Sequence, residues 1–238
     1  MKKIINSYRE LSEHKCLLFI AMLYVVVTTV PSLFLYRFIQ LGPLVLPGGM
    51  FIFPCIYILG DVIAEVYGFK VARLIIWYSL ICNFIFAFTI LSVIYLPFPS
   101  ATAHVANQYA FVFHHILRGD IANLAGVLVG SFLNAYLLTK WKILVKGRMF
   151  IVRSFTSSAI GELVMLSIWV TIAFSGKLTD LKILHLAFSD YAVRLLYALI
   201  FATPAAWIVR LIRNWEQVDI YDYSTDFNPF ALNIQDKN

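Results

Sequence analysis

Charged residues are scarce in this sequence. They make up 13% of its 238 residues, against about 25% in an average soluble domain. A chain with so few charges cannot cover a globular surface with polar side chains, which excludes an ordinary cytosolic enzyme and a disordered chain. Hydrophobic residues make up 61% instead, so we expect most of the folded chain to be surrounded by lipid.

Cysteines are few, and the motifs of common cofactor sites are missing. The three cysteines, Cys16, Cys55 and Cys82, are odd in number and show no CxxC spacing, which excludes a disulfide scaffold and disfavours a zinc site. The sequence also has no HxxxH pair and no glycine-rich phosphate loop. We therefore expect no metal, no cofactor and no enzymatic activity, with an intramembrane enzyme or an assembly factor kept as an alternative.

The net charge of +6 raises the question of a nucleic-acid partner. Lys and Arg lie mainly in the short segments between apolar runs, however, and do not form the basic face of a soluble domain. The sequence therefore predicts no nucleic-acid partner, and the basic residues are interpreted as signals that orient a membrane protein.

Long apolar runs reach or approach the ~20 residues that a helix needs to cross a bilayer. They predict an all-α membrane protein with six transmembrane helices in residues 1–213, followed by a polar cytoplasmic tail, 214–238. Alternating segments of ~10 residues, typical of a membrane barrel, are absent. The expected spans are 16–38, 44–66, 71–96, 120–138, 150–174 and 186–208.

The basic residues also predict the orientation. Most of the 19 Lys and Arg precede the first span, join the second to the third or the fourth to the fifth, or follow the sixth. With an even number of spans, this bias places both termini in the cytoplasm. The apolar run that follows the basic N-terminal stretch is longer than a signal-peptide core, and we interpret it as a retained helix.

The second span contains residues that disrupt a helix. Pro47, Gly48 and Gly49 are followed by Pro54, and these residues remove or loosen backbone hydrogen bonds. One interpretation is a kink or a helix that begins late, near Met50. The other is a discontinuous helix beside a substrate site, because irregular backbone at membrane depth needs protein or a wet cavity around it.

Two carboxylates occur one helical turn apart in the second span. Asp61 and Glu65 lie on one helix face because they are four residues apart. Two like charges there repel unless a cation, a proton or a donor-rich ligand lies between them. The alternative is a structural pair held by Lys70 and Arg73 at the start of the next helix.

A third carboxylate, Glu162, lies deep in the fifth span, about 13 Å of helix from Arg153. Ionisable groups at such depth are costly and usually functional. Without a partner, this carboxyl group is expected to carry a proton, whereas Arg194 or Arg118 offers a structural partner. A buried guanidinium such as that of Arg194 in turn needs an acid or a ligand carbonyl.

Amides and aromatic rings complete the set of candidate ligand-binding residues. Buried amides such as Asn83 and Asn123 often only hold helices together, and aromatic rings such as Trp169 and Tyr57 either pack in the core or stack on a planar ligand. The predicted substrate-binding residues are Glu162, Asp61, Glu65, Asn83, Asn123, Arg194, Arg118, Trp169 and Tyr57.

Three stretches resemble a known family of membrane transporters. They are Phe53-Pro54 with Asp61-Val62-Ile63-Ala64-Glu65-Val66-Tyr67-Gly68 and Ala72-Arg73; Arg153 with Ser157-Ser158 and Gly161-Glu162; and Asp219, Tyr221-Asp222, Thr225 and Phe227-Asn228-Pro229-Phe230. Together they resemble the queuosine precursor transporter family, the YhhQ-type family also called putative vitamin uptake transporters. One departure is that Leu163, Val164 and Met165 stand where the family usually has an Asp soon after this acid.

The resemblance implies an inner-membrane importer of a 7-deazaguanine precursor of queuosine. A carboxylate can accept both adjacent N–H donors of a guanine-like base. We therefore expect Glu162 and either Asp61 or Glu65 to read the base, with Asn83, Asn123 or Arg194 on its carbonyl and aromatic rings on its faces.

Energy coupling and assembly stay open at this point. No nucleotide-binding motif is present, which favours a secondary transporter or a facilitator. The alternative is the substrate-binding subunit of an energy-coupling-factor-like vitamin importer that needs partner ATPases. The expected partners are the deazaguanine base and the lipid bilayer, and a homodimer is possible.

Overall fold

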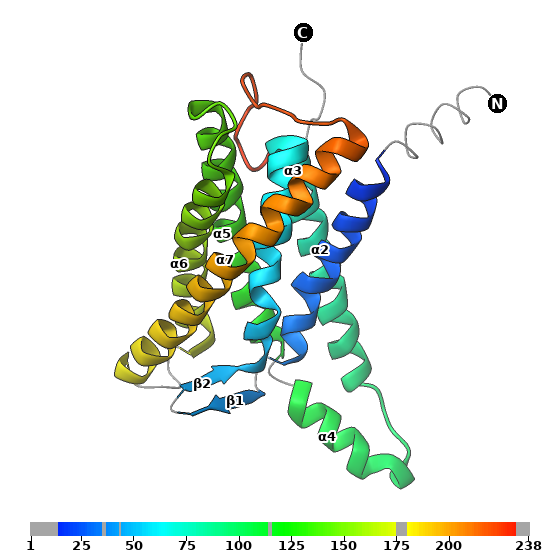
Figure 1. The fold of residues 1–238 in the computed structure, drawn as a ribbon. Coiled ribbons are helices and arrows are strands. Elements are labelled where there is room, and N and C mark those ends of the chain that lie inside the picture. The colour runs from blue at the N-terminus through cyan, green and yellow to red at the C-terminus, as the bar shows by residue number, and fades with distance from the viewer. Residues whose placement is uncertain (1–13, 35–36, 43, 114–115, 175–179, 232–238) are drawn as a thin grey trace, which may run out of the picture.

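The computed structural model describes residues 14–34, 37–42, 44–113, 116–174 and 180–231. Its long helices run along one another as a bundle (Figure 1). They are α2 (Lys15–Leu33), α3 (Phe53–Ile94), α5 (Ile116–Leu144), α6 (Phe150–Phe174) and α7 (Asp180–Glu216), and a shorter helix, α4 (Ala103–Phe113), lies between α3 and α5 in the chain. Apart from one hairpin, the described residues form no sheet, which confirms the all-α fold class.

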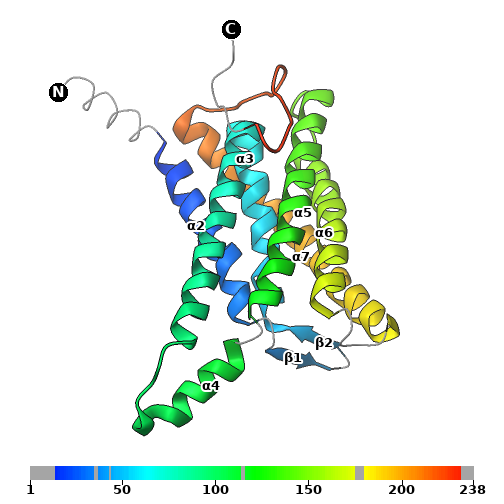
Figure 2. The same ribbon diagram turned by 180° about the vertical axis from the view of Figure 1, so that it is seen from behind.

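Five helical stretches are long and apolar enough to cross a membrane, and one of them covers Gly48–Ile94. This stretch reverses at Gly68, whose backbone has φ 80° and ψ 173°. Residues 53–67 and 69–94 then lie antiparallel, side by side (Figure 2). Ile63 of the first half therefore lines the same cavity as Ile75 and Ile76 of the second. With both halves of α3 counted, the bundle has the six helical segments that the sequence predicts.

The irregularity predicted at Pro47–Gly49 is confirmed, and it is larger than expected. β1 (Phe38–Leu41) pairs with β2 (Leu44–Pro47) in an antiparallel hairpin, and the 3-10 turn η1 (Gly48–Phe51) leads into α3. The helical course expected at Phe38 and over 44–47 is therefore wrong, because these residues belong to strands, whereas the alternative of a helix that begins late agrees with the start of α3 at Phe53. The backbones pack too closely for side chains here, since a Cβ at Gly48 would lie 2.8 Å from the Arg37 carbonyl oxygen.

Other helices extend beyond the expected spans. α5 covers more than 120–138 at both ends, and α7 covers more than 186–208 at both ends, whereas α6 covers 150–174. The segment between the third and fourth spans contains the 3-10 turn η2 (Ser100–Thr102) and α4. Exposed Phe, Leu and Ile side chains lie along the outer faces of the helices, as a lipid-facing surface requires.

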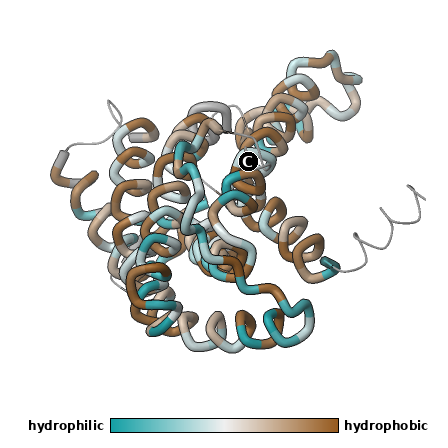
Figure 3. Tube along the Cα trace, turned by 90° about the horizontal axis from the view of Figure 1, so that it is seen from above, coloured by the Kyte–Doolittle hydropathy of each residue, from teal (hydrophilic) through white to brown (hydrophobic). Residues whose placement is uncertain are grey.

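The first and last described helices meet at one end of the bundle, here called the tail end. The backbone N–H of Cys16 and the hydroxyl of Tyr67 both donate to the carboxylate of Glu216, each at 2.7 Å. The opposite end, which carries β1 and β2, is called the hairpin end. Seen from the tail end, hydrophobic residues line the helices and hydrophilic stretches lie near the C-terminal end of the described chain (Figure 3).

Helices α5 and α6 cross at glycines. A Cβ at Gly130 would lie 2.7 Å from the Gly161 carbonyl oxygen and 2.6 Å from both the Tyr57 hydroxyl and the Cβ of Met165. Real Cβ atoms do not approach so closely, so the two backbones and the Tyr57 ring meet only because no side chain separates them. This crossing places the residue after Gly161, Glu162, beside Tyr57.

The glycine crossing yields a direct prediction. Gly130→Ala should destabilise the folded protein by about 1–3 kcal/mol, because the added methyl group overpacks the crossing. Gly60→Ala is the matched control, since a Cβ there meets only the Tyr24 ring, at 3.7 Å. Thermal unfolding in detergent measures both. Equal melting temperatures for the two variants would contradict this view of the crossing.

Candidate functional site

A column of polar side chains runs through the core of the bundle. Phe53, Tyr57, Asp61 and Glu65 follow one another at four-residue spacing on α3, which places them in one stripe along the helix axis. All four are buried. Ser154, Ser158 and Glu162 form a similar stripe on α6 and are buried too.

Glu65 is the centre of an ion-pair layer at the tail end of the column. Its side chain is 0% exposed, and its two oxygens accept from both terminal nitrogens of Arg153, at 2.8 and 3.0 Å. Arg213 donates to the same carboxylate at 2.7 Å. The structural partners of Glu65 are therefore Arg153 and Arg213, whereas the sequence suggested Lys70 and Arg73.

The chain after α7 crosses this layer. We call residues 217–231 the C-terminal strap. Lys142, which is 1% exposed, donates at 2.6 Å to the carbonyl of Glu65, to the Asp219 carboxylate and to the carbonyl of Ile220. Arg213 also contacts Asp219, at 2.9 Å. The strap thus closes the ion-pair layer from outside the bundle.

Further along, the strap binds the turn at Gly68 and the second half of α3. The buried Asp222 carboxylate accepts from the backbone N–H of Phe69 at 2.9 Å. Arg73 donates to the carbonyls of Asp226 and Asn228, at 3.0 and 2.8 Å. Burial and the nearby Asp219 raise the pKa of Tyr221, and the Lys142 ammonium lies 4.3 Å from the centre of that ring. The part of the tail expected as a polar extension is therefore a packed element as far as the structure describes it.

Asp61 forms the middle layer of the column. Its carboxylate accepts from the amide of Asn134 at 2.6 Å, from the hydroxyl of Ser154, and from the hydroxyl of Ser158 at 3.2 Å. All these donors are neutral and buried. Asp61 is thus held by hydrogen bonds from α5 and α6, and no described cation forms an ion pair with it.

The third layer, toward the hairpin end, contains polar atoms without protein partners. Glu162 is 1% exposed, and neither of its carboxylate oxygens has a hydrogen-bond partner among the described residues. Arg194 donates from one nitrogen to Asp190 at 2.9 Å, but its Nε and other terminal nitrogen are unpaired. The Tyr57 hydroxyl and one oxygen of Asp190 are unpaired as well.

These groups belong to one electrostatic cluster. Glu162 interacts with Arg194 and Asp190 on α7 and with Asp61 on α3, and Tyr57 interacts with both Glu162 and Arg194. The guanidinium of Arg194 lies 4.4 Å from the centre of the Phe53 ring. Unpaired acceptors and unpaired donors therefore lie together in the buried core, which is costly unless a further polar group binds there.

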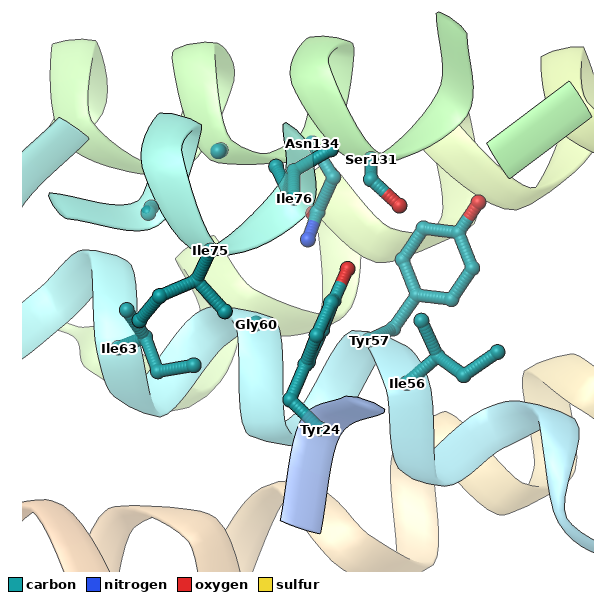
Figure 4. Close-up of a pocket in the computed structure, with 11 residues that line it drawn as sticks. Tyr24, Ile56, Tyr57, Gly60, Ile63, Ile75, Ile76, Ser131 and Asn134 are labelled. Atoms are coloured by element: carbon teal, nitrogen blue, oxygen red, sulfur yellow. The ribbon is translucent and has the colours of Figure 1, made fainter. Parts of the chain in front are cut away.

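A small cavity adjoins the cluster. Tyr24 and Tyr57 line it with Ser131 and Asn134 of α5 (Figure 4). Its free volume is about 10 Å³, which corresponds to roughly one water molecule. A planar molecule of the size of a purine is larger than this cavity.

The remaining predicted residues lie elsewhere. Asn83 donates to the Thr28 hydroxyl at 3.1 Å and to the Ser79 carbonyl at 2.9 Å, which joins α3 to α2. Asn123 is buried on α5 with an unpaired oxygen, and Trp169 is buried on α6, two turns beyond Glu162. Arg118 belongs to the first turn of α5, and its side chain lies outside the described part of the structure.

The site also contains residues that the sequence analysis passed over. Asp190 is fully buried and lies four residues before Arg194, and this acid–base spacing in an apolar helix was the available signal. Among the residues described, no three His, Cys, Asp or Glu side chains form a group that could hold a metal ion.

The fold and this column define a multi-pass α-helical membrane protein in which most of the buried charged residues belong to one column. The family model described as "Putative vitamin uptake transporter" matches residues 47–209, well over half of the chain, and the chain belongs to that family. The matched region includes all three layers except Arg213 and the strap. No curated protein and no solved structure matches the chain.

Proposed function

We propose that the protein imports a 7-deazaguanine precursor of queuosine, 7-cyano-7-deazaguanine or its aminomethyl form, across the inner membrane. Membership of a family of uptake transporters supports the transport activity. The observation that carries the substrate class is a pair of buried groups that interact electrostatically, the carboxylate of Glu162, with both oxygens unpaired, and the guanidinium of Arg194, with two of its nitrogens unpaired.

The pairing edge of a guanine-like base complements this pair. Its ring N–H and amino group are adjacent donors, and a carboxylate with two free oxygens accepts both. Its carbonyl oxygen lies next to these donors and needs a donor of its own, which the unpaired nitrogens of Arg194 supply. The Tyr57 ring and hydroxyl then offer a stacking surface and one more polar contact.

This assignment separates the two carboxylates of α3. Glu65 has three cationic contacts nearby and is proposed to be structural. Asp61 is one turn from Tyr57 and is held by neutral donors, so it is proposed to border the base site through Asn134. The strap and the ion-pair layer lie between this site and the tail end, where they form the barrier to release on that side.

Uptake by the Glu162→Gln variant tests the proposal. The glutamine amide has one acceptor oxygen, whereas the two adjacent N–H donors of the base need two acceptors. Its NH2 group would also face one of those donors. Sites that hydrogen-bond a substrate reject a mismatched edge by about 10⁴-fold or more, so uptake should fall to background while membrane levels stay normal. Uptake of labelled 7-cyano-7-deazaguanine into proteoliposomes is the measurement.

Two controls make this experiment decisive. Ser167→Ala alters an exposed hydroxyl on the same helix, which bonds only the Leu163 carbonyl, and it should transport normally. Proteoliposomes that contain this chain alone should import the base without ATPase partners, in contrast to a substrate-binding subunit. Full uptake by Glu162→Gln would refute the assignment of the site.

A further inference from the structure

The layer around Glu162 does not balance its charges. Asp61, Glu162 and Asp190 are three carboxyl groups that are each no more than 1% exposed. Among the described residues, Arg194 is the one guanidinium that interacts with them. If all four groups were ionised with no donor bound to Glu162, the buried core would hold two uncompensated negative charges, which is costly.

The surroundings of Glu162 supply no second cation among the described residues. α3 presents Tyr57 and Asp61, and α7 presents Asp190, Tyr191 and Arg194. To the polar lining of the adjoining cavity, as far as the structure describes it, α2 contributes the Tyr24 phenol and α5 the neutral Ser131 and Asn134. The cations of the ion-pair layer are bound to Glu65 and Asp219.

Hydrogen bonding identifies which of the three carboxyl groups takes up a proton. Asp61 accepts three hydrogen bonds from neutral donors, which stabilise its ionised form. Asp190 bonds directly to Arg194. Glu162 has neither kind of partner, so its ionised form is the least stabilised of the three.

We propose that Glu162 is a proton-binding site that exchanges its proton for the substrate. In the closed arrangement Glu162 is a neutral carboxylic acid. When a neutral base presents two donors to it, the acid loses its proton to solvent and binds the base as a carboxylate. This inference rests on the proposed function, and it adds that each binding event releases one proton.

The sign of the pH dependence follows from the exchange. The free protein holds the proton and the complex does not, so protons compete with the base. Affinity for a neutral base should therefore rise with pH, by up to about tenfold per unit over the range in which Glu162 of the free protein is protonated. When the protein returns without substrate, Glu162 is protonated, so one proton crosses the membrane in the direction opposite to the base.

Infrared spectroscopy tests the proton without any substrate. Purified wild-type protein should show the carbonyl band of a buried carboxylic acid, and Glu162→Gln should lack it. Glu216→Gln is the matched control, because that glutamate bonds Cys16 and Tyr67 at the tail end, and it should keep the band. A wild-type spectrum identical to that of Glu162→Gln in this region would overturn the proposal.

Calorimetry tests the exchange itself. Binding of 7-cyano-7-deazaguanine, measured in two buffers with different heats of ionisation, should release about one proton per site. Binding with no proton release would overturn the exchange and leave the proposed transport function standing. If the base does not bind at all, the proposed substrate is wrong, and the infrared result still decides whether Glu162 holds a proton.

Discussion

Arg153→Leu should destabilise the folded protein by up to about 3–5 kcal/mol, because it removes the bidentate partner of a fully buried carboxylate. The Glu65 carboxylate then keeps one hydrogen bond from a cation, that of Arg213, whose side chain is 25% exposed. Both terminal nitrogens of Arg153 donate to the carboxylate of Glu65, so the pair is bidentate. Arg153 also donates to the Arg148 carbonyl at 2.9 Å, which ties the start of α6 to the preceding turn. The loss should appear as a large drop in melting temperature in detergent.

A double variant separates charge from packing. Adding Glu65→Gln to Arg153→Leu should recover part of the lost stability, since the buried carboxylate that has lost its bidentate partner is then replaced by a neutral amide. Arg210→Leu is the control, because Arg210 is exposed on α7, and it should melt close to wild type. If Arg153→Leu has the same melting temperature as Arg210→Leu, the ion-pair layer does not stabilise the fold.

Much of the architecture was predictable from the sequence. The apolar runs identify the helices because membrane thickness sets their length. The four-residue spacing of Asp61 and Glu65 places both on one face, as found. The hairpin at 38–47 was not predictable, because an apolar run of this composition fits a helix as well as a strand, and the close backbone contacts of Gly48 and Gly49 exist only in the folded bundle.

The charges were harder to interpret. Lys142 and Arg153 flank apolar runs, and sequence rules count such residues as orientation signals. In the structure they are only 1% and 3% exposed, because their long side chains reach inward to Glu65 and the strap. Arg73 follows Glu65 by only eight residues in the sequence, yet the reversal at Gly68 directs it to the strap carbonyls instead. Sequence distance does not reveal such partners.

The C-terminal strap shows the same limitation. Its acidic residues indicate a polar tail, and Asp219, Asp222 and Asp226 do act through their charge on cations of the bundle. The other contacts use backbone carbonyls, such as that of Pro229, which accepts from the Trp77 indole at 2.8 Å. Any residue type has such a carbonyl, so composition does not predict that the segment packs.

Ending the chain at Glu216 should therefore be strongly destabilising. Lys142 would keep only the Glu65 carbonyl as an acceptor, and Arg73 would lose two carbonyls. A buried cation that loses its partner costs about 3–5 kcal/mol, so this variant should melt far below wild type. Tyr223→Ala is the control within the strap, because Tyr223 is 73% exposed.

The sign of a second substitution tests the cause. In the full-length chain, Lys142→Met should lower the melting temperature, because Asp219 and the Ile220 carbonyl lose their donor. In the truncated chain the same substitution should raise it, because it removes the unpaired ammonium from the core. A synthetic peptide of residues 217–231 should stabilise the truncated protein with Lys142 and have much less effect on the methionine variant. If Lys142→Met lowers stability equally in both backgrounds, the strap does not act through this lysine.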